Sequence, residues 1–335
     1  VSAEVIIKSL TIEVYTGKLS KRRKISEALS PIERVWLAIY WYNSSSTSMI
    51  FIFISLFAKI FFNYNDFFTN SHVKIMAKSL LNYQFHQVKQ TINTPVLIFI
   101  HGLFGDMDNL GVIARAFSEH YSILRIDLRN HGHSFHSEKM NYQLMAEDVI
   151  AVIRHLNLSK VILIGHSMGG KTAMKITALC PELVEKLIVI DMSPMPYEGF
   201  GHKDVFNGLF AVKNAKPENR QQAKPILKQE INDEDVVQFM LKSFDVNSAD
   251  CFRFNLTALF NNYANIMDWE KVRVFTPTLF IKGGNSSYIK IENSEKILEQ
   301  FPNATAFTIN GSGHWVHAEK PDFVIRAIKR FLNKN

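Results

Sequence analysis

A short stretch in the middle of the chain, Val161–Lys171, constrains the fold more strongly than any other. It opens with Val-Ile-Leu-Ile, an apolar and mostly β-branched run that is typical of a buried strand. Gly165-His-Ser-Met-Gly169 then turns the chain, and Lys171–Leu179 has helical composition. A serine at such a turn takes a strained backbone conformation that exposes its hydroxyl above the sheet edge. The stretch therefore predicts a strand, a sharp turn carrying the nucleophile Ser167, and a helix.

Strand and helix patterns alternate over most of the remaining chain. Strand-like runs occur at 82–88, 96–100, 122–126, 186–190, 277–281 and 305–309. Helical spacing is found at 110–120, 143–156 and 294–300 and in a closing helix after Pro321. This alternation predicts an α/β fold with a mostly parallel central sheet flanked by helices.

Residues 196–270 interrupt the alternation, since they contain several helical patterns and no clear strand. We expect a helical lid here, inserted after the sixth strand and lying over the carboxyl ends of the strands, where such sheets bind ligands. The alternative is that these helices pack elsewhere on the domain body.

Residues 1–75 differ from the rest of the chain. Their two apolar runs, 35–42 and 49–58, are each shorter than the roughly 20 residues that a membrane-spanning helix requires. Three interpretations compete: a weak membrane anchor, a targeting segment, or sequence translated in error upstream of a natural start at Met76. We favour the third, because the segment has no core pattern. The folded domain is therefore expected over residues 76–335.

Composition narrows the partners and the compartment. The 38 basic and 31 acidic residues give a net charge of +7, but no basic stripe with aromatic platforms follows residue 75, so we expect no nucleic-acid partner. Two isolated cysteines, Cys180 and Cys251, have no metal or redox spacing and suit a reducing compartment. We expect a cytoplasmic protein, with weak membrane association through residues 49–62 as the alternative. Membrane contact is expected only if residues 1–75 belong to the natural protein.

A serine nucleophile requires a base, which in this architecture is a histidine in a loop after the last strand. His314 fits this position, because a strand and a glycine-rich turn precede it and a terminal helix follows. The other histidines considered are His101, His131, His166 and His317.

The acid that orients His314 is harder to place. The region after Ile281, where the acid usually lies, contains no carboxylate before Glu292. Asp191 lies at the end of the strand that follows the helix after Ser167, and a carboxylate there can reach the histidine from an adjacent strand. We favour Asp191; the alternative is that it only caps the following turn.

Attack on a carbonyl also requires hydrogen-bond donors for the oxyanion. We predict the backbone N–H groups of Leu103, after the strand 96–100, and of Met168. Asp127 and Arg129 are expected to hold loops by ion pairing, without a catalytic role.

The following motifs together carry a resemblance to a known family: Asn82-Tyr-Gln, His101-Gly-Leu-Phe-Gly, Asp108-Asn-Leu-Gly, Asp127-Leu-Arg-Asn-His-Gly, Gly165-His-Ser-Met-Gly-Gly-Lys171, Asp191-Met-Ser-Pro, Lys282-Gly-Gly-Asn-Ser and Gly313-His-Trp-Val-His-Ala-Glu-Lys-Pro-Asp322. Residues 76–335 resemble the YbfF-type esterases, a compact branch of the α/β-hydrolase superfamily. The resemblance implies the α/β-hydrolase fold and a triad of Ser167, His314 and Asp191. It further implies that Ser286 occupies the usual acid position and assists the histidine by hydrogen bonding.

The resulting hypothesis is a serine carboxylesterase that needs no cofactor or metal and works through an acyl-enzyme intermediate. The resemblance implies short-to-medium acyl esters as substrates, and we expect a small-molecule acyl ester or thioester as the partner. Lid packing around Phe104 and Trp315 is expected to shape the substrate pocket. The alternatives are an acyl-thioesterase or carbon–carbon bond hydrolase on the same triad, or a ligand-sensing receptor that retains the triad. The sequence predicts neither the natural substrate nor the oligomeric state.

Overall fold

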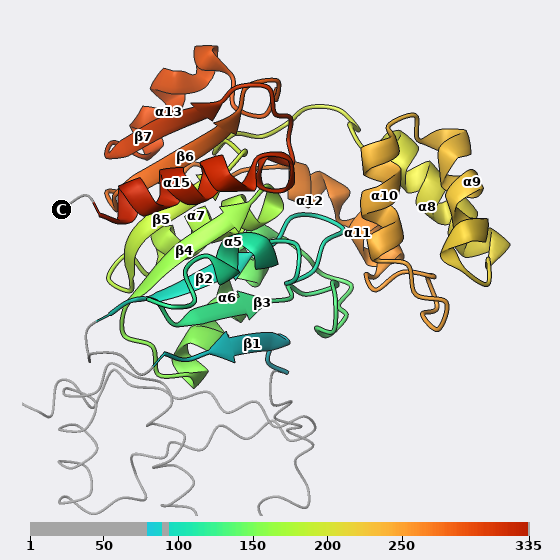
Figure 1. Ribbon diagram of the computed structural model, residues 1–335, viewed down its shortest axis with the longest axis horizontal. Coiled ribbons are helices and arrows are strands. Elements are labelled where there is room, and N and C mark those ends of the chain that lie inside the picture. The colour runs from blue at the N-terminus through green and yellow to red at the C-terminus, as the bar shows by residue number, and fades with distance from the viewer. Residues whose placement is uncertain (1–78, 89–93, 334–335) are drawn as a thin grey trace, which may run out of the picture. The chain divides into compact units, whose positions relative to one another are not determined.

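The computed structural model describes residues 79–88 and 94–333, which belong to a compact unit spanning Lys78–Asn335 (Figure 1). The three interpretations of residues 1–75 therefore lie outside the described residues. Within the described ranges, no helix is both long enough and apolar enough to cross a bilayer.

A seven-stranded sheet forms the centre of this unit. Its strands are β1 (Tyr83–His86), β2 (Val96–Ile100), β3 (Ile123–Ile126), β4 (Val161–His166), β5 (Val184–Ile190), β6 (Thr278–Gly283) and β7 (Ala304–Ile309). They are ordered β1-β3-β2-β4-β5-β6-β7, and all neighbours are parallel except β1 and β3. The predicted mostly parallel sheet is confirmed.

Helices cover both faces of the sheet. The strand β2 shows why, because its alternate side chains join two separate cores. Leu97 and Phe99 pack with residues of α5 (Gly111–Arg115) and α15 (Pro321–Leu332). Ile98 and Ile100 pack on the opposite face, whose core includes residues of α6 (Tyr142–His155), α7 (Met168–Leu179) and α13 (Ser294–Gln300).

The predicted helical insertion is present between β5 and β6. It contains α8 (Lys203–Ala215), α9 (Arg220–Glu230), α10 (Glu234–Lys242), α11 (Leu256–Asn261) and α12 (Tyr263–Met267). The insertion follows the fifth described strand, so its predicted place after a sixth strand is wrong. The strand-like runs of the sequence agree with the structure, because five of them precede residue 196.

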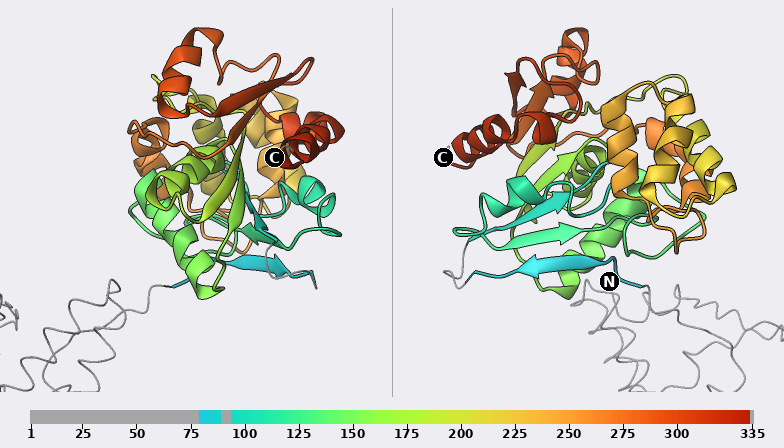
Figure 2. Two further views of the ribbon diagram at one scale, coloured as in Figure 1. Left: turned by 90° about the vertical axis from the view of Figure 1, so that its left-hand side faces the viewer. Right: turned by 45° about the vertical axis from the view of Figure 1, so that its right-hand side comes forward.

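The insertion lies beyond the carboxyl ends of the parallel strands, with α8, α9 and α10 grouped to one side (Figures 1 and 2). Hydrogen bonds attach it to the loops that follow two strands. The hydroxyl of Ser243 donates to the carbonyl oxygen of Phe104 after β2 at 3.0 Å, and Asn255 N–H donates to Asn130 O after β3 at 2.9 Å. These contacts place the insertion over the edge where the predicted site residues lie.

Candidate active site

Ser167 lies at the turn between β4 and α7. Its backbone has φ 53° and ψ −121°, a conformation that is costly for a residue with a side chain. The N–H of Ser167 donates to Ile190 O of β5 at 3.0 Å, which holds the turn against the neighbouring strand. A Cβ atom at Gly165 would lie 2.3 Å from the carbonyl oxygen of Gly169. The close crossing of strand and helix therefore requires glycine here.

Asp191 follows β5 and also has a positive φ, of 49°. Its side chain is completely buried, and its N–H donates to Ile281 O of β6 at 2.8 Å. Gly283 N–H donates to Asp191 Oδ1 at 2.9 Å. One carboxylate oxygen is thus held by the main chain of β6, and the orientation of this oxygen directs Oδ2 toward the loop that carries His314.

His314 lies in the loop between β7 and α14 (Val316–Glu319). Its Nδ1 is 2.8 Å from Asp191 Oδ2, and its Nε2 is 3.0 Å from Ser167 Oγ. A carboxylate only accepts hydrogen bonds, so this network assigns the proton to Nδ1 and leaves Nε2 to accept from the serine hydroxyl. Three predicted residues from the ends of three different strands are brought into one hydrogen-bonded series.

Two further side chains hold His314, and the sequence analysis predicted neither contact. His166 Nε2 lies 3.0 Å from the carbonyl oxygen of His314, so the ring donates to this carbonyl. The ring of Tyr288 stacks on the imidazole of His314 with centroids 3.9 Å apart and an interplanar angle of 25°. Tyr288 lies only two residues after Ser286, but no local pattern in the sequence predicts this stacking.

Ser286 lies beside the acid rather than the base. Its hydroxyl donates to Asp191 Oδ2, and this is the oxygen that also accepts from His314. That Ser286 assists His314 by hydrogen bonding stays a prediction, and in this geometry Ser286 would act through Asp191. Asp191, directly after β5, thus connects Ser286 in the loop after β6 with the imidazole.

The other histidines considered, His101, His131, His166 and His317, are all buried. His131 Nε2 accepts from Phe104 N–H at 3.2 Å, which requires a neutral ring. Burial lowers the pKa of His131 to about 3, with a smaller contribution from a neighbouring histidine, and burial also lowers the pKa of His317 to about 3. Among the described histidines, His314 is the one hydrogen-bonded to Ser167.

Two backbone N–H groups near Ser167 are free to bind an oxyanion. Within residues 94–333, the N–H groups of Leu103 and Met168 have no acceptor, whereas Phe104 N–H donates to a histidine ring. A Cβ atom at Gly102 would lie 3.2 Å from Ser167 Cβ, so the loop after β2 passes close to the serine. Leu103 and Met168, which carry the two free N–H groups, are the residues directly after Gly102 and Ser167.

The two predicted pocket residues have different surroundings. Phe104 is only 2% exposed, and its ring packs against Phe206 and Phe254 of the insertion at centroid distances of 5.3 and 5.2 Å. Trp315 is half-buried, and its ring lies 5.5 Å from that of Phe239 in α10. A groove of about 640 Å³ between residues 196–200 and α11–α12 is lined by neither. Their role as pocket residues stays a prediction.

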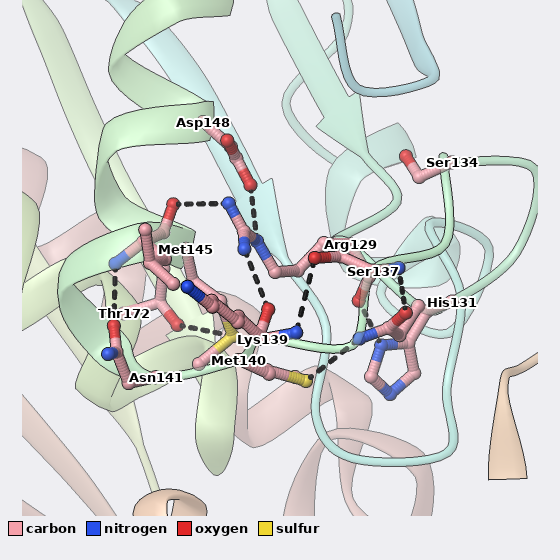
Figure 3. A network of polar contacts seen from close by, with 12 residues as sticks. Arg129, His131, Ser134, Ser137, Lys139, Met140, Asn141, Met145, Asp148 and Thr172 are labelled. Atoms are coloured by element: carbon pink, nitrogen blue, oxygen red, sulfur yellow. Dashed lines mark hydrogen bonds and ion pairs between the residues drawn. The ribbon is translucent and has the colours of Figure 1, made fainter. Parts of the chain in front are cut away.

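Arg129 is at the centre of a polar network that joins the loop after β3 to α6 (Figure 3). Its Nε lies 2.6 Å from Asp148 Oδ2, and its Nη1 donates to Lys139 O at 2.8 Å. Asp127, by contrast, has no ion pair among the described residues and accepts from main-chain groups, including Met107 N–H at 2.7 Å. The prediction that Arg129 holds a loop by ion pairing is confirmed. The same prediction for Asp127 is wrong, because Asp127 holds its loop by hydrogen bonds.

Comparison with known proteins agrees with this architecture. Residues 95–321 match the family model described as the alpha/beta hydrolase fold. The match covers more than half of the chain and includes β2 to α14. The chain belongs to the α/β-hydrolase fold family.

Individual relatives define the class of enzyme more closely. The chain is 43% identical to esterase YbfF of Escherichia coli (strain K12) over 254 residues, which are 76% of this chain and 99% of the relative. It is 34% identical to the mouse sn-1-specific diacylglycerol lipase ABHD11 over 248 residues, which are 71% of this chain and 81% of the relative. A solved marine microorganism esterase is 35% identical with a TM-score of 0.70, covering 75% of this chain and 99% of its own. These relatives support an ester hydrolase of the α/β-hydrolase fold, as the resemblance predicted.

Proposed function

We propose that this protein is a serine carboxylesterase that hydrolyses short-to-medium acyl esters through an acyl-enzyme intermediate. The observation that carries the proposal is the series Ser167–His314–Asp191, with distances of 3.0 Å and 2.8 Å between its members. Relatives that are named as an esterase and a lipase support the same reaction class.

The two ring nitrogens of His314 have different roles in the reaction. As Ser167 Oγ attacks the ester carbonyl, His314 Nε2 takes its proton and then donates that proton to the leaving alcohol. Asp191 Oδ2 accepts from the Nδ1–H and stabilises the imidazolium that forms. A water molecule, activated by the same histidine, then hydrolyses the acyl group from Ser167.

The tetrahedral intermediates carry a negatively charged oxygen that needs preorganised donors. The free N–H groups of Leu103 and Met168 supply two such donors beside Ser167. Because both belong to the main chain, they are fixed before the substrate binds. We assign Phe104 and Trp315 to the wall of the substrate pocket and Ser286 to the support of Asp191.

The test is a comparison of wild-type protein with the Ser167→Ala variant on nitrophenyl esters of increasing chain length. We expect kcat to fall by about 10⁴–10⁶ with an unchanged circular dichroism spectrum, because the nucleophile is lost and the fold is kept. Mass spectrometry of wild-type protein mixed with nitrophenyl acetate is expected to show one added acetyl group, which is absent in the variant.

Ser294→Ala provides the matched control, because Ser294 is exposed on the first turn of α13 and its hydroxyl donates to Ile291 O, not to a residue of the site. It should keep the activity of the wild-type protein. Hydrolysis by Ser167→Ala at the wild-type rate would overturn the assignment of the nucleophile.

A further inference from the structure

Lys171 is a fully buried lysine one helical turn after Ser167 in α7, and the proposed reaction does not use it. Its Nζ donates to the main-chain oxygens of Asp268 at 3.0 Å and Met267 at 3.3 Å. Three aromatic rings face the same ammonium group, at distances from Nζ to the ring centroid of 4.7 Å for Tyr197, 5.4 Å for Tyr142 and 5.9 Å for Trp269. Burying a lysine is costly, so an enclosed ammonium group with two hydrogen bonds and three facing rings suggests a specific role.

The partners of Lys171, apart from Tyr142 of α6, come from the two ends of the helical insertion. Tyr197 lies where the chain leaves β5 for the insertion, and Met267 and Asp268 lie where the insertion ends. The two ends are also paired directly, because Tyr197 N–H donates to Met267 O at 2.9 Å. Lys171 therefore connects the helix that begins at the nucleophile with the base of the insertion.

A continuous series of contacts leads from Lys171 to His314. The ring of Tyr197 faces the ammonium group, and its hydroxyl donates to Tyr288 O at 2.8 Å. The same hydroxyl accepts from Ser193 N–H at 3.0 Å, which fixes its position beside the loop after β5. The ring of Tyr288 then stacks on the imidazole of His314 at a centroid distance of 3.9 Å.

We propose that Lys171 is a positioning residue of the esterase site. Its ammonium group clamps both ends of the insertion to α7 and, through Tyr197 and Tyr288, holds the imidazole of His314 in line with Ser167. The proposal rests on the proposed function of Ser167 and His314, and it adds a group that touches neither the substrate nor the reacting atoms.

The charge of Lys171 gives the clamp a pH dependence. Burial lowers the pKa of Lys171 to about 7, while the nearby carboxylate of Asp268 acts in the opposite direction. The ammonium group is therefore present below about pH 7 and is lost as the pH rises through that value. Burial raises the pKa of Tyr197 to about 12 and that of Tyr142 well above its usual value, so neither facing tyrosine changes charge in this range.

The experiment measures the second-order rate at which a small, neutral fluorophosphonate labels Ser167. This rate depends on the alignment of Ser167 with His314 and needs few contacts with the insertion. For Lys171→Met at pH 6 we expect a rate about tenfold below that of the wild-type protein, within the range found for substitutions along coupled networks. At pH 9 Lys171 of the wild-type protein is uncharged. The wild-type rate divided by the Lys171→Met rate should therefore fall from about ten at pH 6 toward one at pH 9.

Lys175→Met is the matched control. Lys175 lies one turn further along α7 and pairs with Glu270 at 2.7 Å, also just after the insertion, but Glu270 is 82% exposed. Its loss should change the labelling rate by less than about twofold at every pH. A role of Lys171 in packing alone would lower the rate by a pH-independent factor.

A double-mutant cycle tests the path. Tyr197→Phe keeps the ring that faces Lys171 but removes the hydrogen bond to Tyr288 O. If both residues act along one path, the double variant Lys171→Met/Tyr197→Phe is labelled no more slowly than the slower of the two single variants. In the control cycle, the effects of Lys175→Met and Tyr197→Phe on the labelling rate should be additive.

The outcomes separate the two proposals. A wild-type protein that is not labelled, or a Ser167→Ala variant that is, would overturn the proposed function. A labelled wild-type protein whose rate equals that of folded Lys171→Met, a pH-independent ratio, or additive effects in the cycle would overturn the clamp alone. If Lys171→Met does not fold, Tyr197→Phe decides, and labelling of this variant at the wild-type rate overturns the clamp.

Discussion

The carboxyl ends of the strands, the edge that carries the proposed triad, and the helical insertion are held in place by different groups, the edge by the main chain and the insertion largely by side chains. At the edge, Ser167 and Asp191 both have left-handed backbones, with φ of 53° and 49°, and each donates its N–H to the carbonyl oxygen of the next strand. The insertion is attached largely by side chains, such as Ser243 to Phe104 O and Lys171 to Asp268 O.

This difference predicts different effects of substitutions in the two regions. Main-chain hydrogen bonds hold Ser167 and Asp191 in place, so a small or isosteric substitution there removes a chemical group and leaves the site in place. A substitution in the attachments of the insertion removes the contact itself, so the insertion shifts relative to the edge. We therefore expect edge variants to change kcat and attachment variants to change KM or alignment.

The largest effect at the edge, apart from loss of the nucleophile, is expected for Asp191→Asn. The amide keeps the size of the side chain but cannot stabilise the imidazolium of His314, and we expect kcat to fall by about 10⁴ with little change in KM. Steady-state kinetics on a nitrophenyl ester measure both constants.

Glu292→Gln is the control for this variant, since Glu292 was the other carboxylate considered and lies in a 3₁₀ helix, Ile291–Asn293, as an exposed residue. It should retain the wild-type kcat. If Glu292→Gln were the more damaging of the two, the acid of the triad would have to be reassigned.

A smaller loss is expected for Ser286→Ala. Asp191 Oδ2 then keeps its hydrogen bond from His314 but loses the one from Ser286, and the loss of one charge-assisted hydrogen bond corresponds to about tenfold in kcat. Ser287→Ala, the exposed neighbour, serves as the control in the same assay. An unchanged kcat in Ser286→Ala would show that the main chain alone orients Asp191.

The smallest effect is expected for Arg253→Gln in the insertion. Arg253 lies 2.7 Å from Asp106 in the loop after β2, and partly exposed ion pairs contribute little to stability. We expect KM to rise about threefold and kcat to change by less than about twofold, because the insertion moves and the edge does not.

Lys213→Gln is the matched control, because Lys213 pairs with Asp250 at 2.7 Å entirely within the insertion. Its kinetic constants should equal those of the wild-type protein. A loss of kcat in Arg253→Gln comparable to that in Asp191→Asn would remove the distinction between the two regions.

Local sequence patterns predicted most of the fold. Runs such as Val161–Ile164 are apolar because a central strand is buried on both faces, and the period of 3.6 residues in the closing helix reflects one buried face. The glycines at 165 and 169 indicated the turn at Ser167, because only glycine fits where strand and helix cross so closely. His314 followed from its position after the last strand.

The sequence by itself thus determined the alternation of strands and helices and the residues placed at strand ends. Only the tertiary structure decided which side chains meet there. Ser286 contacts Asp191 in place of His314, and Lys171 reaches the carbonyl oxygen of Asp268, 97 residues away. Such contacts depend on how distant segments pack, and no local periodicity encodes them. In composition Lys171 is one of 38 basic residues; its burial beside Tyr197 makes it a candidate part of the site.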